Sequence, residues 1–393
     1  MAAVDVLVVG GGPAGCVAAW EAAAAGAGDV LLVERDRAIG APVRCAEGVG
    51  SDGLREFLDP DGAPWVSRRI TRVIFVSPDD TEVRLAERDV GYILDRTRFE
   101  PALAERAIRA GADVRISTEA AGMTREGGRW RVTLRGPRGE QSCDARVVIG
   151  ADGVETMVGR WAGLDTRVAA RDMESCAQYV VSNISFDPDA IYLHFGPSVA
   201  PGGYAWVFPK GEGVANVGLG VVTLKGDGRT ARQWLDGYIA HRFPGAAVTG
   251  LTVGGVISAA TARRTVADGV MLAGDAAHMI NPLSGGGIIT AMKAGRLAGR
   301  HAARAIREGD VSARSLQPYH DEWMRLLGDA HQKYYKLKET INRFDDGFFD
   351  SLARTVNGIP ADKRTLARVM TAALVRHPTL LPVAAQLFVQ EFC

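Results

Sequence analysis

The spacing of hydrophobic residues at the start of the chain predicts a strand, a glycine turn, a helix and a second strand. Residues 4–9 form an apolar run interrupted only by Asp5, as expected of a strand buried on both faces. Residues 14–25 are rich in alanine, a strong helix former. A second apolar run, residues 30–33, ends at Glu34. Together these patterns predict a βαβ unit at the start of the chain.

Strand patterns dominate the middle of the chain. Residues 66–94 and 112–149 predict short strands, and residues 95–110 between them predict a helix. Residues 171–222 alternate between apolar and other positions, which predicts an antiparallel sheet with one face turned toward a ligand or another part of the protein. Residues 270–288 then combine a buried strand with a glycine-containing turn that opens a helix.

The last part of the chain, residues 316–393, has a mainly helical pattern, and we expect breaks near Pro360 and Pro378. Elements of nucleotide-binding type therefore precede and follow a strand-rich insertion. This order predicts an α/β fold with an inserted antiparallel sheet and a helical C-terminus.

Composition limits the classes of partner. Of the 393 residues, 47% are hydrophobic and 23% are charged, and the 46 basic residues equal the 46 acidic ones. No net charge draws the chain to nucleic acid, so we expect no nucleic-acid partner. The five cysteines include no CxxC pair and show no metal-ligand spacing, which favours reduced thiols, a cytoplasmic location and no metal site. We expect no signal peptide, and residues 17–27 are too short and mixed to span a bilayer.

A glycine motif connects the first strand to the first helix. In Gly10-x-Gly12-x-x-Gly15, the first glycine permits a tight turn, the second lets the backbone approach a pyrophosphate, and the third lets helix and strand pack closely. The helix N-terminus attracts the phosphates. Glu34, at the end of the next strand, is placed to accept a hydrogen bond from a ribose hydroxyl. The motif alone does not distinguish FAD from NAD.

Three later segments add to this motif. Asp152 and Gly153 follow a buried strand, and Gly274 and Asp275 follow another, before a glycine run opens a helix. Arg96 lies in "LDRTRFEPALAERA", a helical segment. Together with the glycine motif, and in their order along the chain, these segments resemble the FAD-dependent enzymes of the p-hydroxybenzoate hydroxylase fold. The resemblance covers about residues 1–320.

The resemblance implies a Rossmann-like FAD-binding domain and a substrate domain inserted into it. It implies that the second Asp binds the ribityl chain or pyrophosphate, and that the last helix directs its positive end at the flavin. The implied FAD-binding domain covers residues 1–65, 95–165 and 262–315, the substrate sheet 66–94 and 166–261, and the helical region 316–393. The implied cofactor-binding residues are Gly10, Gly12, Ala14, Gly15, Glu34, Arg35, Arg44, Cys45, Ala46, Gly48, Arg96, Asp152, Gly153, Gly274, Asp275, Pro282, Gly285, Gly286, Gly287 and Ile288.

An aromatic strand sequence, "PGGYAWVFPKG", narrows the function further. Tyr204, Trp206 and Phe208 occupy alternate positions, so in a strand all three rings share one face. The pattern P-x-x-Y-x-W-x-F-P-K resembles the geranylgeranyl reductase family, whose archaeal members saturate the isoprenoid chains of membrane lipids. "RCAEGVG", residues 44–50, is similar to the Cys-containing loop of that family beside the flavin. The resemblance implies an FAD-dependent reductase acting on a long-chain prenyl lipid.

The chemistry of that reaction requires an acid. An isolated alkene accepts hydride poorly, so a proton must reach the other carbon. Cys45 is the first candidate and Tyr204 the second, with Trp206 beside them; the alternative for Cys45 is a small buried packing residue. We expect Tyr204, Trp206, Phe208 and His194 to contact the substrate, although His194 is equally compatible with a position on the sheet alone.

Other questions stay open at the level of sequence. The chain has no second dinucleotide motif, so NADPH and ferredoxin are both candidate electron donors. The segment 364–388 mixes Arg with apolar residues, which suits either packing on the protein or peripheral contact with the inner face of a membrane. A monooxygenase or halogenase of the same fold, and a flavin-loaded lipid carrier without turnover, are the alternative functions.

Overall fold

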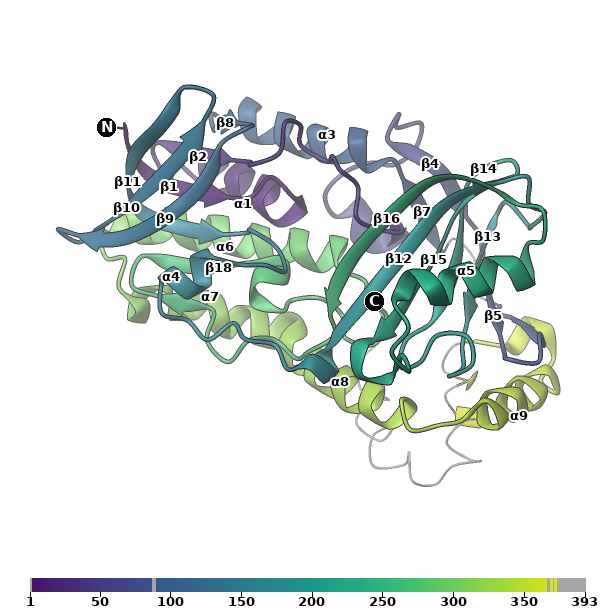
Figure 1. The fold of residues 1–393 in the computed structure, drawn as a ribbon. Helices are drawn as coiled ribbons and strands as arrows, with labels where there is room; N and C mark the ends of the chain where they lie inside the picture. Colours follow the sequence, from purple (N-terminus) through teal and green to yellow (C-terminus); the bar gives the residue numbers. More distant parts are fainter. Residues whose placement is uncertain (1, 87–89, 366–367, 370, 373–393) are drawn as a thin grey trace. The chain divides into compact units, whose positions relative to one another are not determined.

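A computed structural model describes residues 2–86, 90–365, 368–369 and 371–372 (Figure 1). The chain divides into two compact units. Unit 1 comprises residues 1–43, 96–167 and 259–332, and unit 2 comprises residues 44–95, 168–258 and 333–393. These units are defined by contacts, and the functional domain bounds expected from the sequence stay a prediction.

Unit 1 contains a mainly parallel sheet whose centre is the predicted βαβ unit. The strand order is β17-β18-β11-β1-β2-β8, and β10 and β9 extend β11 as an antiparallel ribbon. β1 pairs in parallel with β2 and with β11, and β11 with β18. The strands are β1 (Ala2–Val9), β2 (Val30–Val33), β8 (Asp113–Arg115), β9 (Glu119–Glu126), β10 (Arg129–Gly136), β11 (Gly139–Gly150), β17 (Val266–Ala267) and β18 (Val270–Leu272).

Helices α1 and α6 lie side by side in unit 1 because glycines remove side chains from their contact (Figure 1). A Cβ on Gly295 would lie 2.2 Å from the carbonyl oxygen of Ala14, and one on Gly299 would lie 2.5 Å from that of Ala18. The predicted helices near 14–25 and 95–110 are confirmed as α1 and α3. The helices are α1 (Pro13–Ala24), α3 (Arg96–Arg109), α4 (Val158–Trp161), α6 (Ile288–Glu308) and α7 (Ala313–Trp323), with a π-helical turn at Met324–Gly328.

Unit 2 is built on a seven-stranded sheet of order β16-β12-β15-β14-β13-β5-β6. Its pairs are antiparallel except β13 with β5, so the antiparallel sheet predicted for residues 171–222 is confirmed. A second, smaller sheet has the strand order β3-β7-β4. In the sequence its strands lie before and after β5 and β6. The strands are β3 (Gly48–Gly50), β4 (Val66–Ile70), β5 (Arg72–Val76), β6 (Glu82–Arg84), β7 (Gly91–Leu94), β12 (Met173–Ser182), β13 (Ala190–His194), β14 (Ala205–Gly211), β15 (Val214–Val222) and β16 (Ala247–Ile257).

Helix α5 (Ala231–Arg242) covers one face of this sheet (Figure 1). The core beneath it includes Ala205 and Val207 of β14, which pack with Leu219 and Trp234. Because side chains alternate along a strand, Trp206 and Phe208 point to the opposite face. The alternation expected for the aromatic strand is therefore confirmed.

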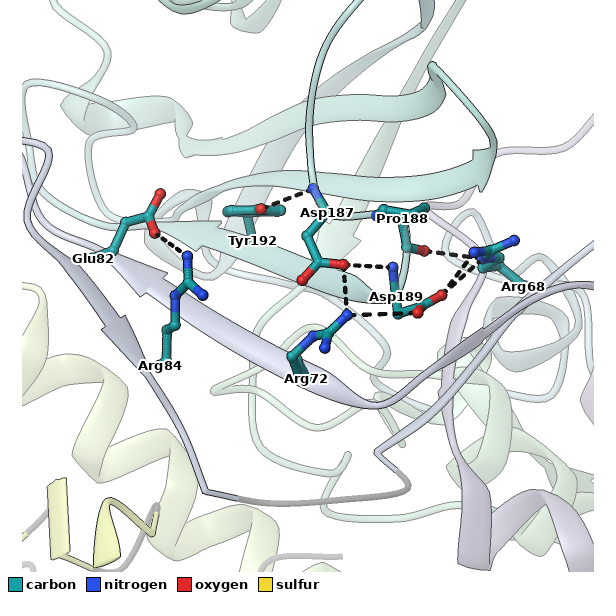
Figure 2. Close-up of polar contacts among 8 residues, drawn as sticks. All are labelled: Arg68, Arg72, Glu82, Arg84, Asp187, Pro188, Asp189 and Tyr192. Atoms are coloured by element: carbon teal, nitrogen blue, oxygen red, sulfur yellow. Dashed lines mark hydrogen bonds and ion pairs between the residues drawn. The ribbon is translucent and has the colours of Figure 1, made fainter. Parts of the chain in front are cut away.

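Ion pairs fix the loop before β13 to the junction of β4 and β5 (Figure 2). Arg68 Nη2 lies 2.7 Å from Asp189 Oδ1, and Arg72 Nη2 lies 2.7 Å from Asp187 Oδ1. The Asp187 amide donates to the Tyr192 hydroxyl at 3.1 Å (Figure 2). The two ion pairs connect residues over a hundred positions apart, so they hold β5 beside β13.

The described residues after residue 328 are mainly helical, as predicted. They contain α8 (Asp329–Ile341), α9 (Asp346–Asn357) and a short 3-10 turn at Ala361–Lys363, after Pro360. Ala353 and Val356 of α9 pack against Val73 and Val83 of the unit 2 sheet. The predicted break at Pro378, and most of the segment considered for membrane contact, lie outside the described residues.

Candidate active site

The glycine motif in unit 1 leaves open space at the start of α1. Gly10 has φ +106°, in the left-handed region, and a Cβ on Gly15 would lie 1.8 Å from the carbonyl oxygen of Gly10. By contrast, a Cβ on Gly12 would meet no described atom within 4 Å, and no described side chain caps α1. Free amide groups and a positive helix end facing open space suit a pyrophosphate.

Glu34 lies against this turn. Its Oε2 accepts a hydrogen bond from the Gly11 amide at 2.6 Å, and its Oε1 accepts one from the Asp36 amide at 2.8 Å. The carboxylate is thereby fixed at the carboxyl end of β2, where the sequence predicts a ribose contact. The neighbouring Arg35 instead forms an exposed ion pair with Glu155, with 3.2 Å between Nη1 and Oε2.

Asp152 presents a buried acceptor atom. Its Oδ2 accepts from the amides of Met157 and Val158 at 2.7 and 3.0 Å. Its Oδ1 is buried and has no hydrogen-bond partner within the described part of the chain. Buried polar atoms are nearly always hydrogen-bonded, so an orphaned acceptor of this kind suits a hydroxyl of a bound ligand. Gly153, with φ +76°, makes the turn after it.

The segment before α6 brings Asp275 to the same glycine-rich region of unit 1. Gly274, with φ +67°, is so close to α1 that a Cβ there would lie 3.0 Å from the Cβ of Ala14. Asp275 Oδ1 would lie 3.6 Å from a Cβ on Gly287, the residue that immediately precedes α6. Burial raises the pKa of Asp275, and the nearby Arg96 opposes that rise. Arg96 itself pairs with Glu100.

The turn that opens α6 is held by its own backbone. Gly286 accepts from the Asn281 amide at 3.0 Å, and Gly285 adopts φ +68°. Pro282 is buried in this turn and Ile288 is the first helical residue. No side chain in the described ranges caps α6, so a second positive helix end is available in unit 1. With the orphaned Asp152 atom and the open Gly12, these features fit a bound dinucleotide.

A separate constellation lies in unit 2, on the sheet face opposite α5. We name Tyr204, Trp206 and Phe208 the ring row. Trp206 Nε1 donates to Gln178 Oε1 at 2.9 Å, and the Tyr204 and Trp206 rings have centroids 5.9 Å apart. A Cβ on Gly218 would lie 2.5 Å from the Trp206 ring, so glycine makes room for the indole.

The Cys45 loop, residues 44–50, is hydrogen-bonded to this face of the sheet. Gln178 Nε2 donates to the Cys45 carbonyl at 3.0 Å, and Asn216 Nδ2 donates to the Ala46 carbonyl at 3.3 Å. Lys210 Nζ lies 2.7 Å from Glu47 Oε2, and Glu47 is 4% exposed. The Glu47 amide also donates to Cys45 Sγ at 3.2 Å. The sheet therefore holds the backbone of the Cys45 loop, and the Glu47 amide of the same loop contacts the thiol.

The rest of the loop is close to the sheet as well. A Cβ on Gly48 would lie 2.7 Å from the Phe208 ring, and a Cβ on Gly254 would lie 4.0 Å from the Cβ of Arg44. The structure thus brings Arg44, Ala46 and Gly48 together with the ring row inside unit 2.

Three titratable groups gather around Tyr204 of the ring row: Cys45, Glu174 and Cys176. Burial raises the pKa of Tyr204, and Glu174, Cys176 and Cys45 add to the rise through their charges. Burial also raises the pKa of Cys176 and that of Glu174. Raised pKa values favour the protonated forms of Tyr204, Cys176 and Glu174.

His194 does not join the ring row. It pairs with Ala205 across β13 and β14, so its side chain lies on the α5 face, 5.3 Å from the Tyr238 ring. There it lines a cavity of about 330 Å³ with Arg242 and Phe243, and burial lowers its pKa to about 3. Its proposed substrate contact stays a prediction that this geometry does not favour.

Several site residues were absent from the sequence-based set. Gln178, Glu174 and Cys176 alternate along β12 in a stretch that indicated only a strand. Lys210 and Asn216 were also missed, although Lys210 ends the aromatic motif that suggested the substrate face. A search for polar residues at alternate positions of strands neighbouring the ring row would have found them.

The described residues were also compared with the requirements of a membrane-spanning helix and of a metal site. Within the described ranges, no helix is both long and apolar enough to traverse a bilayer. The described residues also contain no cluster of three or more His, Cys, Asp or Glu side chains able to hold a metal ion.

Comparison with protein families matches both parts of the chain. Residues 3–190 match the family model "FAD binding domain", and residues 172–256 match "Geranylgeranyl reductase catalytic domain". A digeranylgeranylglycerophospholipid reductase of Methanocella arvoryzae is 41% identical over 96% of this chain and 97% of its own length. FAD, expected from the ordered motifs, is thereby confirmed as the cofactor.

Solved structures extend the comparison to the fold. A geranylgeranyl bacteriochlorophyll reductase-like protein from Thermoplasma acidophilum superposes with a TM-score of 0.90 at 33% identity, covering 98% of this chain and all of the other. A myxobacterial chondrochloren halogenase, at 18% identity and TM-score 0.69 over 95% of this chain and 97% of its own, shares the fold alone. The chain belongs to the geranylgeranyl reductase family of FAD-dependent oxidoreductases.

Proposed function

We propose that this protein saturates carbon–carbon double bonds in the geranylgeranyl or related polyprenyl chains of a membrane-lipid precursor. One observation in the structure carries the proposal: a row of aromatic rings lies on the sheet face to which the Cys45 loop is hydrogen-bonded, beside buried titratable groups. A flexible hydrocarbon offers no polar handle, so aromatic surface is what can hold it. The names and near full-length match of the relatives support the same substrate class.

The FAD would be held by unit 1. We propose that the open N-terminus of α1 at Gly12 receives the pyrophosphate, that Glu34 accepts from the adenosine ribose, and that Asp152 and Asp275 bind polar parts of the cofactor. The uncapped end of α6 would stabilise negative charge on the flavin. When bound, reduced FAD supplies the hydride for the alkene.

The protein supplies the proton. Cys45 is the first candidate acid, because the sheet holds its loop through Gln178 and Asn216 and its Sγ accepts a hydrogen bond from the Glu47 amide. Tyr204 is the alternative donor, since its raised pKa keeps the phenol protonated. Trp206 and Phe208 would position the prenyl chain of the lipid and exclude water from the reacting carbons.

The electron donor and the cellular site are further parts of the proposal. NADPH and ferredoxin both remain donors to be tried. We propose a cytoplasmic enzyme that meets its lipid at the inner face of the membrane, because a geranylgeranyl lipid resides in a bilayer.

An anaerobic half-reaction tests the function. The FAD-loaded enzyme is reduced chemically, mixed with a geranylgeranyl lipid, and followed by flavin absorbance and lipid mass. Flavin reoxidation with a gain of one H₂ per double bond supports the reductase. A product formed only with oxygen would indicate a monooxygenase or halogenase, and unchanged lipid with reduced flavin would indicate a carrier; either result would overturn the proposal.

A further inference from the structure

One side-chain amide joins the ring row to the Cys45 loop inside unit 2. Gln178, on β12, accepts a hydrogen bond at Oε1 from Trp206 Nε1 at 2.9 Å, and its Nε2 donates to the Cys45 carbonyl at 3.0 Å. Gln178 is 7% exposed and Trp206 is 9% exposed. An indole N–H can only donate and a carbonyl oxygen can only accept, so the two partners together allow a single orientation of the amide. Gln178 therefore forms a fixed bridge between them.

The register of three strands makes this bridge possible. Gln178 on β12 and Trp206 on β14 both pair with Gly218 on β15, the strand between them. Neighbouring strands are about 4.8 Å apart, so the two side chains must span about 10 Å between their backbones. A Cβ on Gly218 would lie 2.5 Å from the Trp206 ring. Because Gly218 has no side chain, the indole can lie across β15 and reach the amide.

Two other contacts hold the loop beyond this bridge. Asn216 Nδ2 donates to the Ala46 carbonyl at 3.3 Å, and Lys210 Nζ lies 2.7 Å from Glu47 Oε2. A variant without the bridge would keep both contacts, so we expect it to fold with its loop on the sheet. Such a variant loses the direct link between the thiol-bearing residue and the indole.

We propose that Gln178 is a positioning residue that sets where Cys45 lies relative to the Trp206 ring, and so aligns the proton donor with the prenyl chain that the ring contacts. The inference rests on the proposed function. In that reaction the alkene π bond breaks, one carbon receives a hydride from reduced FAD, which is thereby reoxidised, and the other carbon receives the proton of the Cys45 S–H bond. The thiolate that remains regains a proton from solvent. Gln178 exchanges no proton and acts on distance alone; a misplacement of about 1 Å between reacting groups can cost about 100-fold in rate.

Single-turnover kinetics detect such a role because the proton is delivered in the step that is observed. The reduced, FAD-loaded enzyme is mixed with a geranylgeranyl lipid, and flavin reoxidation is followed by stopped-flow absorbance. Gln178→Met keeps an unbranched side chain and removes both hydrogen bonds, so reoxidation should slow about 10- to 100-fold, whereas flavin reduction by an artificial donor should be unchanged. The matched control is Gln141→Met, at an exposed position of strand β11 in unit 1, which should leave both steps unchanged.

Combined variants show whether the amide acts through its two partners. If Gln178 positions Cys45, adding Gln178→Met to Cys45→Ala should cause no further slowing, because no thiol is left to align. Trp206→Phe keeps an aromatic ring but lacks the indole N–H, so its combination with Gln178→Met should be no slower than the slower of the two single variants. A role of Gln178 in packing alone would instead slow reoxidation by the same factor in every background.

Hydrogen exchange gives a readout that needs no turnover. In the FAD-loaded protein, the backbone amides of residues 44–50 should exchange about fivefold faster in Gln178→Met than in the wild type, the factor expected for the loss of one net hydrogen bond. The amides of residues 139–150 in unit 1 should exchange at the same rate in both proteins.

The outcomes separate this inference from the proposed function. Normal reoxidation in Gln178→Met, equal slowing by this substitution in the wild-type and Cys45→Ala backgrounds, or unchanged exchange in residues 44–50 would overturn the inference. Normal reoxidation in Cys45→Ala alone would also overturn it. A wild type that the lipid does not reoxidise at all would instead overturn the proposed function. If Gln178→Met does not fold, Gln178→Asn, whose amide is one methylene too short to reach both partners, replaces it in the same combinations.

Discussion

At the scale of single residues, buried polar groups pair with one another on the face of the unit 2 sheet that carries the ring row. Lys210 illustrates this, since its Nζ lies 2.7 Å from Glu47 Oε2 and 2.6 Å from the Leu94 carbonyl. Asn216 Nδ2 donates to the same Glu47 oxygen at 2.8 Å. A motif that the sequence presented as aromatic thus ends in a residue whose role is to neutralise a buried carboxylate.

Replacing Lys210 should therefore loosen the Cys45 loop. Lys210→Met keeps most of the side-chain volume and removes the cation, so the free energy of unfolding should fall by about 1.5–3 kcal/mol. Adding Glu47→Gln should recover part of the loss, because no buried charge then lacks its counterion. Urea unfolding measures both effects. The exposed Lys363→Met is the control, and equal losses in the two lysine variants would show that the Glu47 pair contributes nothing.

The role of Cys45 is tested by separating the two half-reactions. Cys45→Ser keeps the approximate size of the side chain and an acceptor for the Glu47 amide but replaces the thiol with a hydroxyl, a much weaker acid. Flavin reduction by an artificial donor should be unchanged, because it needs no acid at this site. Reoxidation by the lipid should slow about 100-fold or more, and Cys45→Ala should be at least as slow.

Stopped-flow absorbance follows both steps in each Cys45 variant. Normal reoxidation in Cys45→Ala, per folded enzyme, would remove the thiol from the mechanism and give the acid role to Tyr204. Loss of stability with both half-reactions intact would make Cys45 a packing residue.

At the scale of elements, the turn between β1 and α1 separates folding from cofactor binding. A Cβ on Gly15 would collide with the Gly10 carbonyl oxygen at 1.8 Å, whereas a Cβ on Gly12 meets no described atom within 4 Å. Gly12 also has φ −74°, which alanine adopts without strain. Gly15 is therefore required by the fold, whereas Gly12 leaves space for the ligand.

This contrast predicts different outcomes for two similar substitutions. Gly12→Ala should leave the stability of the FAD-free protein within about 0.5 kcal/mol and weaken FAD binding, because the methyl group occupies the space proposed for the pyrophosphate. Gly15→Ala should lower stability by about 1–3 kcal/mol even without FAD. Thermal unfolding of the FAD-free protein and fluorescence titration with FAD measure the two effects. Equal FAD affinity in Gly12→Ala and the wild type would contradict the placement.

The elements also show how far sequence can predict this fold. Buried runs and glycine turns are local signals, and they predicted β1, α1, β2 and α3 correctly. Alternation in β14 likewise predicted which rings share a face. It did not predict that His194 lies on the other face, because that depends on the register of β13 with β14, where His194 pairs with Ala205. The register depends on how two strands pair, so the sequence of one strand alone does not determine it.

At the scale of the whole molecule, the contacts that complete the site join distant parts of the sequence. Gln178 and Cys45 are 133 residues apart, and Lys338 and Asp172 are 166 apart. No local pattern marks such pairs, so the resemblance to a family located the chemistry while the network around it came only from the structure. The full-length match to relatives shows that both units belong to one functional protein.

Stability of the whole molecule should depend on pH through buried histidine. Burial lowers the pKa of His194 to about 3, from an ordinary value near 6.5. The unfolded chain therefore binds a proton between these values that the folded chain does not bind, so folding loses stability as pH falls from about 6.5 toward 3. Above 6.5 the contribution is complete, and each lower pH unit costs about 1.4 kcal/mol from this residue. His331, whose pKa burial lowers to about 4, acts in the same direction.

A substitution isolates the share of His194. In His194→Leu no proton can bind at this position in either state, so the free energy of unfolding should fall with acid less steeply than in the wild type, by about 1.4 kcal/mol per pH unit. Urea unfolding at several pH values between about 6.5 and 4.5 measures the slope. His241→Leu, an exposed position on the same helix α5 that covers His194, should keep the wild-type slope. Since His194 lies on the face opposite the ring row, the change should leave lipid-dependent flavin reoxidation at neutral pH intact; an unchanged acid slope would show that His194 is protonated as readily in the folded as in the unfolded chain.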